Sequence, residues 1–148
     1  MKLESSSFKN GQEIPRKYGY KKDNINPPLI IKDVPPEAKS LAIIMDDPDA
    51  MKAVGRLWVH WLVWNISPKT TQIKENSIPE NSIQGKTDFG EIAYGGPAPP
   101  DKEHLYIFKL YALDSELNVK KGSTKAQLEE AMKNHIISEA KLEGKYAP

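Results

Sequence analysis

The chain has 148 residues, a length that suits one domain with a hydrophobic core of useful size. Its formal net charge of +1 provides no electrostatic basis for binding nucleic acid or an anionic membrane. The absence of cysteine excludes a disulfide framework, a thiol nucleophile and a thiolate metal site.

The first residues, MKLESSSFKNGQEIP, lack the apolar core of a signal peptide. No window of the sequence approaches the ~20 apolar residues that a membrane-spanning helix needs. We therefore expect a cytoplasmic protein without stable membrane insertion.

Short strands are predicted to dominate residues 1–120. Twelve prolines, several in adjacent pairs, interrupt helices and central strands and favour shaped loops. Runs of β-branched and aromatic residues predict strands at residues 29–31, 40–45, 58–66 and 105–113. The polar segment 67–88 is predicted to be a long surface loop or a weak hairpin.

Three carboxylates end the second of these strands, in the sequence DDPDA. A residue before proline is driven toward an extended conformation, and residues two apart in an extended chain share a face. Asp47 and Asp49 are therefore predicted on one side and Asp46 on the other. The same pattern is also typical of a strand-ending turn with solvated carboxylates, and the motif alone leaves both interpretations open.

The next strand carries a lone histidine between tryptophans, WVHWLVWNI. Strand alternation divides the side chains between two faces. One face carries Trp58, His60, Leu62 and Trp64. The other face carries Val59, Trp61 and Val63. Both faces are apolar, which predicts a strand buried on both sides. A histidine in such a strand needs hydrogen-bond partners, either as a structural residue or at the floor of a pocket.

A loop rich in glycine and proline, YGGPAPP, precedes the last predicted strand. Gly95 and Gly96 allow a ligand to approach the backbone, and their N–H groups can cradle an anion. The prolines hold the shape of the loop. His104 follows, and Tyr106 shares its face two residues later.

The C-terminal sequence has helical spacing. Apolar side chains recur every fourth residue, at Leu128, Met132, Ile136 and Ala140. Thr124 and Gln127 form a capping-box pattern, and Gly144 is a typical stop. These features predict one helix over residues 124–142, packed on the sheet. His135 lies near its apolar stripe and is predicted to be a satisfied core residue.

Three ordered motifs, DPDA, WVHWLVWNI and YGGPAPP followed by HLYIFKLYALD, resemble the phosphatidylethanolamine-binding protein family, which includes the Raf kinase inhibitor proteins. The similarity is strongest to the short bacterial and archaeal branch. It covers nearly the whole chain, since FKNGQEIP, NPPL and AKLEGKY also match. The resemblance implies a single domain over residues 1–148, mostly β, with an antiparallel β-sandwich-like fold and a C-terminal helix.

The resemblance also implies a small anion pocket without catalytic residues, bound metal or cofactor. The positions that match the family's pocket are Asp47, Asp49, Trp58, His60, Gly96, Pro97, His104 and Tyr106. In the family, these residues surround a bound phosphate, acetate or phosphoethanolamine group. Met51 replaces the usual proline of DPDAP and is expected to alter the pocket rim. Leu105 replaces the usual arginine of HRY and, by strand alternation, points away from its neighbours.

The leading interpretation is a non-enzymatic binding protein for phosphate or a phosphorylated head group. Carboxylates raise the pKa of adjacent imidazoles, so charged His60 and His104 are predicted to donate to the anion while Asp47 orients an imidazole. One alternative is a metal-dependent hydrolase in which the two His and two Asp hold Zn or Fe. A third is a regulator of a phosphorylated partner, or an inhibitor of a kinase or protease. The natural ligand, a protein partner and a homodimeric state stay open.

Overall fold

The computed structural model describes residues 1–148. Its strands form two antiparallel sheets. The larger sheet has the order β6-β4-β3-β7-β8 and the smaller one β1-β2-β5. The strands of the larger sheet are β3 (Ser40–Asp47), β4 (Trp58–Ile66), β6 (Ile83–Gln84), β7 (His104–Leu113) and β8 (Ile136–Tyr146). Those of the smaller sheet are β1 (Lys2–Glu4), β2 (Leu29–Lys32) and β5 (Gln72–Ile73). The predicted mostly β class is confirmed.

Helical structure is limited to α1 (Ala50–Val54), α2 (Lys125–Met132) and a 3₁₀ turn, η1 (Arg16–Tyr18). The predicted capping box is present, because the Thr124 side chain accepts from the Gln127 N–H and the Gln127 side chain accepts from the Thr124 N–H. Neither α1 nor α2 has the length and hydropathy that crossing a membrane requires.

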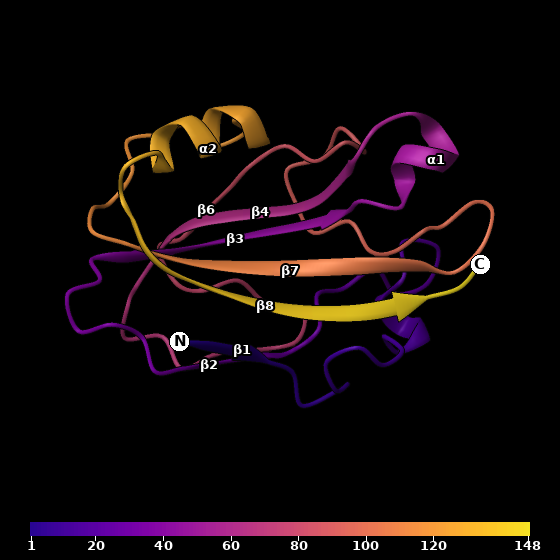
Figure 1. Ribbon diagram of the computed structural model, residues 1–148, viewed down its shortest axis with the longest axis horizontal. Helices are drawn as coiled ribbons and strands as arrows, with labels where there is room; N and C mark the ends of the chain where they lie inside the picture. Colours follow the sequence, from indigo (N-terminus) through magenta and orange to yellow (C-terminus); the bar gives the residue numbers. More distant parts are fainter.

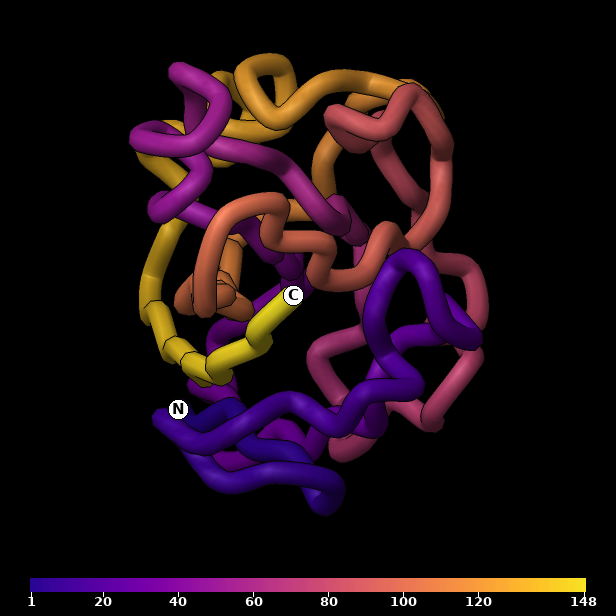
Figure 2. Tube along the Cα trace, turned by 90° about the vertical axis from the view of Figure 1, so that its right-hand side faces the viewer, coloured from indigo at the N-terminus to yellow at the C-terminus, as the bar shows by residue number.

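The larger sheet is covered on both faces, with α2 on one side and β1 and β2 on the other (Figure 1). Viewed from the side, the N-terminal residues lie at the opposite end of the molecule from α2 (Figure 2). Ile43 and Met45 of β3 pack in the core beneath the smaller sheet, whereas Ala42 and Ile44 pack in the core beneath α2. Burial on both faces explains why β3 is apolar at consecutive positions.

A β-bulge interrupts β4 at His60. Met45 pairs with Trp61 and Asp46 pairs with Val59, so His60 is an extra residue without a partner on β3. The bulge reverses the alternation at this end of the strand. Val59 packs in the core beneath α2, although Trp61 packs in the core on the other side. The prediction that these two side chains share a face is therefore wrong.

The C-terminal residues form a strand rather than the second half of a helix. Helix α2 ends at Met132, and Asn134 adopts a φ of 67°, a left-handed conformation that commonly follows a helix end. From Ile136 onward the chain pairs with β7. The helix predicted over residues 124–142 is therefore correct only as far as Met132, because pairing with β7 overrides the local four-residue spacing.

Gly144, predicted to end the helix, lies within β8. A Cβ atom at this position would come within 2.5 Å of the Ile14 side chain. The glycine therefore lets the N-terminal segment lie directly against the sheet. Ile136, predicted in the apolar stripe, is 41% exposed.

His135 lies in the turn before β8 and is not a core residue. Its Nδ1 atom is 2.7 Å from Asp114 Oδ1, and the two side chains are 44% and 48% exposed. The prediction of a core position is wrong because the helix ends before this residue. Exposed ion pairs contribute about 0–1 kcal/mol, so we expect His135→Ala to lower the free energy of unfolding by less than ~1 kcal/mol in urea titrations. A loss above ~2 kcal/mol would contradict this placement.

Candidate functional site

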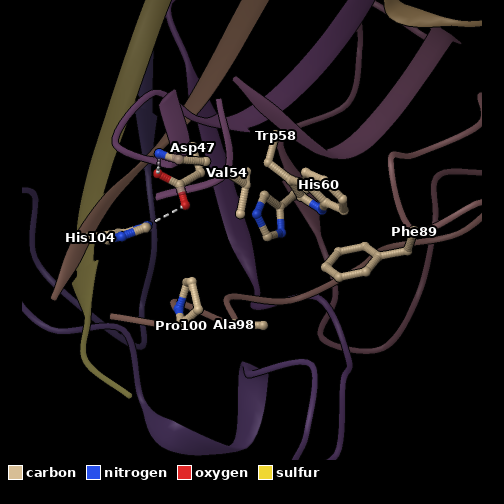
Figure 3. Close-up of a pocket in the computed structure, with 9 residues that line it drawn as sticks. Asp47, Val54, Trp58, His60, Phe89, Ala98, Pro100 and His104 are labelled. Atoms are coloured by element: carbon tan, nitrogen blue, oxygen red, sulfur yellow. Dashed lines mark hydrogen bonds and ion pairs between the residues drawn. The ribbon is translucent and has the colours of Figure 1, made fainter. Parts of the chain in front are cut away.

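A pocket lies at one end of the larger sheet, where its central strand β3 ends and the neighbouring strands β4 and β7 begin. The antiparallel register brings these strand ends together, since Asp47 pairs with Trp58 and Asp46 pairs with Ile107. The pocket encloses about 200 Å³. This is below the roughly 300–1,000 Å³ of sites for drug-sized molecules. The lining residues are Asp47, Ala50, Val54, Trp58, His60, Phe89, Ala98, Pro100 and His104 (Figure 3).

His104 donates from both ring nitrogens to carboxylates. Its Nδ1 is 2.6 Å from Asp47 Oδ2, and its Nε2 is 2.6 Å from Asp101 Oδ1. An ionised carboxylate only accepts hydrogen bonds, so these two contacts favour a ring with a proton on both nitrogens, the imidazolium. Burial opposes this charge, but the two carboxylates outweigh burial and raise the pKa of His104 above its ordinary value.

Asp47 is the fixed partner in this arrangement. Its side chain is only 4% exposed, and Oδ1 accepts from the Ala50 N–H at 3.2 Å while Oδ2 accepts from His104. Figure 3 shows the Asp47 carboxylate hydrogen-bonded to the His104 imidazole. Asp47 therefore orients the His104 ring, which is the role that the sequence predicted for it.

His60 differs from His104 in its charge. The ring is buried, and Nδ1 lies 2.7 Å from the Gly95 carbonyl oxygen. A carbonyl only accepts, so Nδ1 carries the proton. Burial lowers the pKa of His60 from its ordinary value, despite the opposing effects of the Gly95 carbonyl and the Asp47 charge. Burial therefore favours the neutral form of His60, contrary to the expectation of two charged imidazoles.

The N–H groups of the glycine pair donate to other parts of the chain. The Gly95 N–H donates to the His60 carbonyl at 2.8 Å, and the Gly96 N–H donates to Asn24 Oδ1 at 2.8 Å. Both N–H groups are therefore occupied, contrary to our expectation. Gly96 and Pro97 are not lining residues, although both precede the lining residue Ala98.

Asp49 lies outside the pocket. Its side chain is exposed, and Oδ2 accepts from the Leu105 N–H at 2.8 Å, which ties the start of α1 to the start of β7. Asp49 therefore does not line the pocket with Asp47, His60 and His104. No group of three or more His, Cys, Asp or Glu side chains is arranged to hold a metal ion. Met51, on the outside of α1, is 56% exposed.

Tyr106 and Trp58 frame the two histidines. The Tyr106 ring is fully buried, 5.1 Å from the His60 ring and 6.3 Å from the His104 ring between centroids. Its hydroxyl has no hydrogen-bond partner, and burial raises its pKa. Trp58 lines the pocket and meets the Phe89 ring edge-on at 5.7 Å. Tyr106 therefore lies behind the wall of the pocket and Trp58 forms part of it.

Several lining residues were not predicted from the sequence, namely Ala50, Val54, Phe89, Ala98 and Pro100. Asp101, the second partner of His104, was also missed. Ala98 and Pro100 lie in the YGGPAPP loop, and the other signals were Phe89, directly after a polar segment, and an acidic residue close to His104 in sequence. Neither is specific, because contact with the pocket depends on how the loops fold back over β4 and β7.

The chain matches the family model described as phosphatidylethanolamine-binding protein over residues 4–147. A UPF0098 protein of Methanothermobacter thermautotrophicus is 44% identical over 151 residues, covering 99% of this chain and 98% of the relative. A UPF0098 protein of Chlamydia trachomatis is 46% identical over 148 residues, with 99% and 98% covered.

Two solved structures are also similar. A crystal structure described as a phosphatidylethanolamine-binding protein homolog from Chlamydia trachomatis superposes with a TM-score of 0.92 at 45% identity, covering 98% of this chain and 95% of that one. The structure of Escherichia coli YbcL, described as a new member of the mammalian family, has a TM-score of 0.90 at 29% identity, with 98% and 96% covered. The predicted fold is therefore shared with solved proteins over almost its full length.

Proposed function

This chain belongs to the phosphatidylethanolamine-binding protein family, and we propose that its pocket binds a small oxyanion such as phosphate or a phosphorylated head group. Family membership supports a non-enzymatic binding role in general. The observation that carries the finer proposal is the position of His104, whose buried ring lines the pocket with Nδ1 2.6 Å from Asp47 Oδ2.

The proposed contact is a charged hydrogen bond from His104 Nε2. Asp47 occupies Nδ1, so Nε2 is the nitrogen that can serve a ligand. This position already attracts an anionic oxygen, because the Asp101 carboxylate accepts from it. Hydrogen bonds from a charged donor to an oxyanion are stronger than neutral ones. Neutral His60 also lines the pocket, and its Nε2 makes no protein hydrogen bond, so it can accept from a P–OH or ammonium group.

Sulfate affinity should depend on the protonation of His104. Because the pKa of His104 is raised, we expect affinity to be retained below that raised pKa and to fall as pH rises through it, by at most about tenfold per pH unit. Isothermal titration calorimetry with sulfate from about pH 6 to about pH 9 measures this, since the range extends upward from near the ordinary histidine pKa of about 6.5. Sulfate keeps its charge throughout, unlike phosphate.

The other titratable side chains around His104 do not imitate this profile. They are Asp47 on β3, Asp101 in the preceding loop, His60 on β4, Tyr106 on β7 and Tyr146 on β8. Burial raises the pKa of both tyrosines and lowers that of His60. The His135→Ala variant should keep the wild-type profile. Binding with no pH dependence over this range would exclude the imidazolium, and absence of binding would exclude the proposed function.

A further inference from the structure

We propose that Asp101 is a built-in competitor of the anion, occupying His104 Nε2 in the free protein and leaving it when an oxyanion binds. The inference rests on the proposed function and adds a residue that regulates the affinity of the same pocket. It follows from the hydrogen bonds of His104, the surroundings of Asp101 and the charge of the pocket.

His104 has only one position to offer an anion. Its side chain is fully buried, and Nδ1 is committed to Asp47, which is itself buried at the end of β3. The other nitrogen, Nε2, donates to Asp101 at 2.6 Å. An oxyanion that takes a charged hydrogen bond from this ring therefore needs the place that the Asp101 carboxylate now fills.

Asp101 is free to leave, unlike Asp47. Its side chain is 42% exposed, and it lies in the loop before β7. Residues 98–103 make no backbone–backbone hydrogen bond, whereas the Pro97 carbonyl just before them accepts from the Tyr20 N–H. Segments with few backbone hydrogen bonds and exposed side chains open at low free-energy cost. The exposed Asp101 side chain can therefore rotate away from His104 without disturbing the sheet.

The charge of the site also makes Asp101 a competitor. With Asp101 in place, two carboxylates surround one imidazolium and neutral His60, which leaves the site with a formal charge of −1. An incoming anion meets like charge, which disfavours its binding. With Asp101 withdrawn, Asp47 and His104 balance each other. The competition favours doubly charged ligands, such as sulfate or a phosphate monoester. A simple carboxylate carries only the same single charge as Asp101 and has no advantage over it.

The test compares sulfate affinity in Asp101→Ala, Asp101→Asn and the wild type by calorimetry at low salt and about pH 6, below the ordinary histidine pKa of about 6.5. Because exposed ion pairs are weak, we expect Asp101→Ala to bind sulfate roughly threefold to fivefold more tightly. Asp101→Asn should be intermediate, since its amide oxygen is a neutral acceptor. Asp114→Ala is the matched control: it removes a carboxylate 2.7 Å from a histidine outside the pocket and should change nothing.

The outcomes separate this inference from the proposed function. If the wild type binds sulfate and Asp101→Ala binds it equally or more weakly, Asp101 is not a competitor and the anion pocket stands. If Asp114→Ala gains affinity as much as Asp101→Ala, the gain comes from net charge and the competitor role is overturned. If none of the proteins binds sulfate, the proposed function fails and this inference fails with it.

Discussion

His104→Ala is expected to weaken sulfate binding by roughly tenfold to a hundredfold, because a hydrogen bond to a charged group contributes about 1.5–3 kcal/mol. Asp47 occupies Nδ1 of this ring, which leaves Nε2 as the nitrogen that can donate to an anion. Calorimetry near pH 6 measures the change while the wild-type ring is charged. The far-ultraviolet circular dichroism spectrum should stay that of a mostly β protein.

A second variant separates lost binding from lost structure. His104→Ala leaves the buried Asp47 carboxylate without its partner, which lowers stability. His104→Gln retains an N–H donor for Asp47 but carries no charge, so it should be more stable than the alanine variant and still bind sulfate more weakly than the wild type. His135→Ala is the control for losing a histidine elsewhere. Wild-type sulfate affinity in both His104 variants would show that the pocket assignment is wrong.

Trp61→Ala is expected to lower the free energy of unfolding by ~3–5 kcal/mol, because it removes a large buried side chain and leaves a cavity. Trp61 is fully buried in the core between the two sheets. Its Nε1 donates to Gln84 Oε1 at 2.8 Å, and its ring meets the Tyr94 ring edge-on at 5.5 Å. Since domains are stable by only about 5–15 kcal/mol, urea unfolding should show a large shift of the midpoint.

Trp58 provides the matched control, because it lies three residues away on β4 but is only partly buried in the pocket wall. Trp58→Ala should cost distinctly less stability than Trp61→Ala. A loss below ~1 kcal/mol for Trp61→Ala would show that its ring is not packed in the core. Equal losses for the two variants would contradict the different burial of the two rings.

Local signals predicted the secondary structure where neighbouring residues decide it. The aromatic and β-branched run at Trp58–Ile66 predicted a strand with the bounds that the structure has. The Thr124 and Gln127 side chains predicted the start of α2 because a capping box involves only four consecutive residues. The same reasoning failed after Met132. Residues 136–146 have helical spacing in the sequence but form a strand that is hydrogen-bonded to β7. Pairing with a strand more than twenty residues away leaves little trace in the local pattern.

The candidate site was predicted in its residue types more than in their roles. Asp47 and His104 are 57 positions apart, and the motifs placed both at strand ends. Their contact depends on the antiparallel register of β3 and β7. Asp49 belongs to the same motif as Asp47, but the chain turns into α1 there, and its carboxylate binds the Leu105 N–H outside the pocket. The motif had left a strand-ending turn open as an alternative, and spacing along the chain could not decide between the two interpretations.

The sequence by itself determined the family, the strand-rich class and the identity of the two pocket histidines, because these follow from residue types in a fixed order. Only the tertiary structure decided which histidine is charged. His104 is held between the carboxylates of Asp47 and Asp101, whereas a bulge in β4 turns His60 into a buried position against the Gly95 carbonyl. Protonation depends on burial and on the charges within a few ångströms, and both are set by segments that meet only when the chain folds.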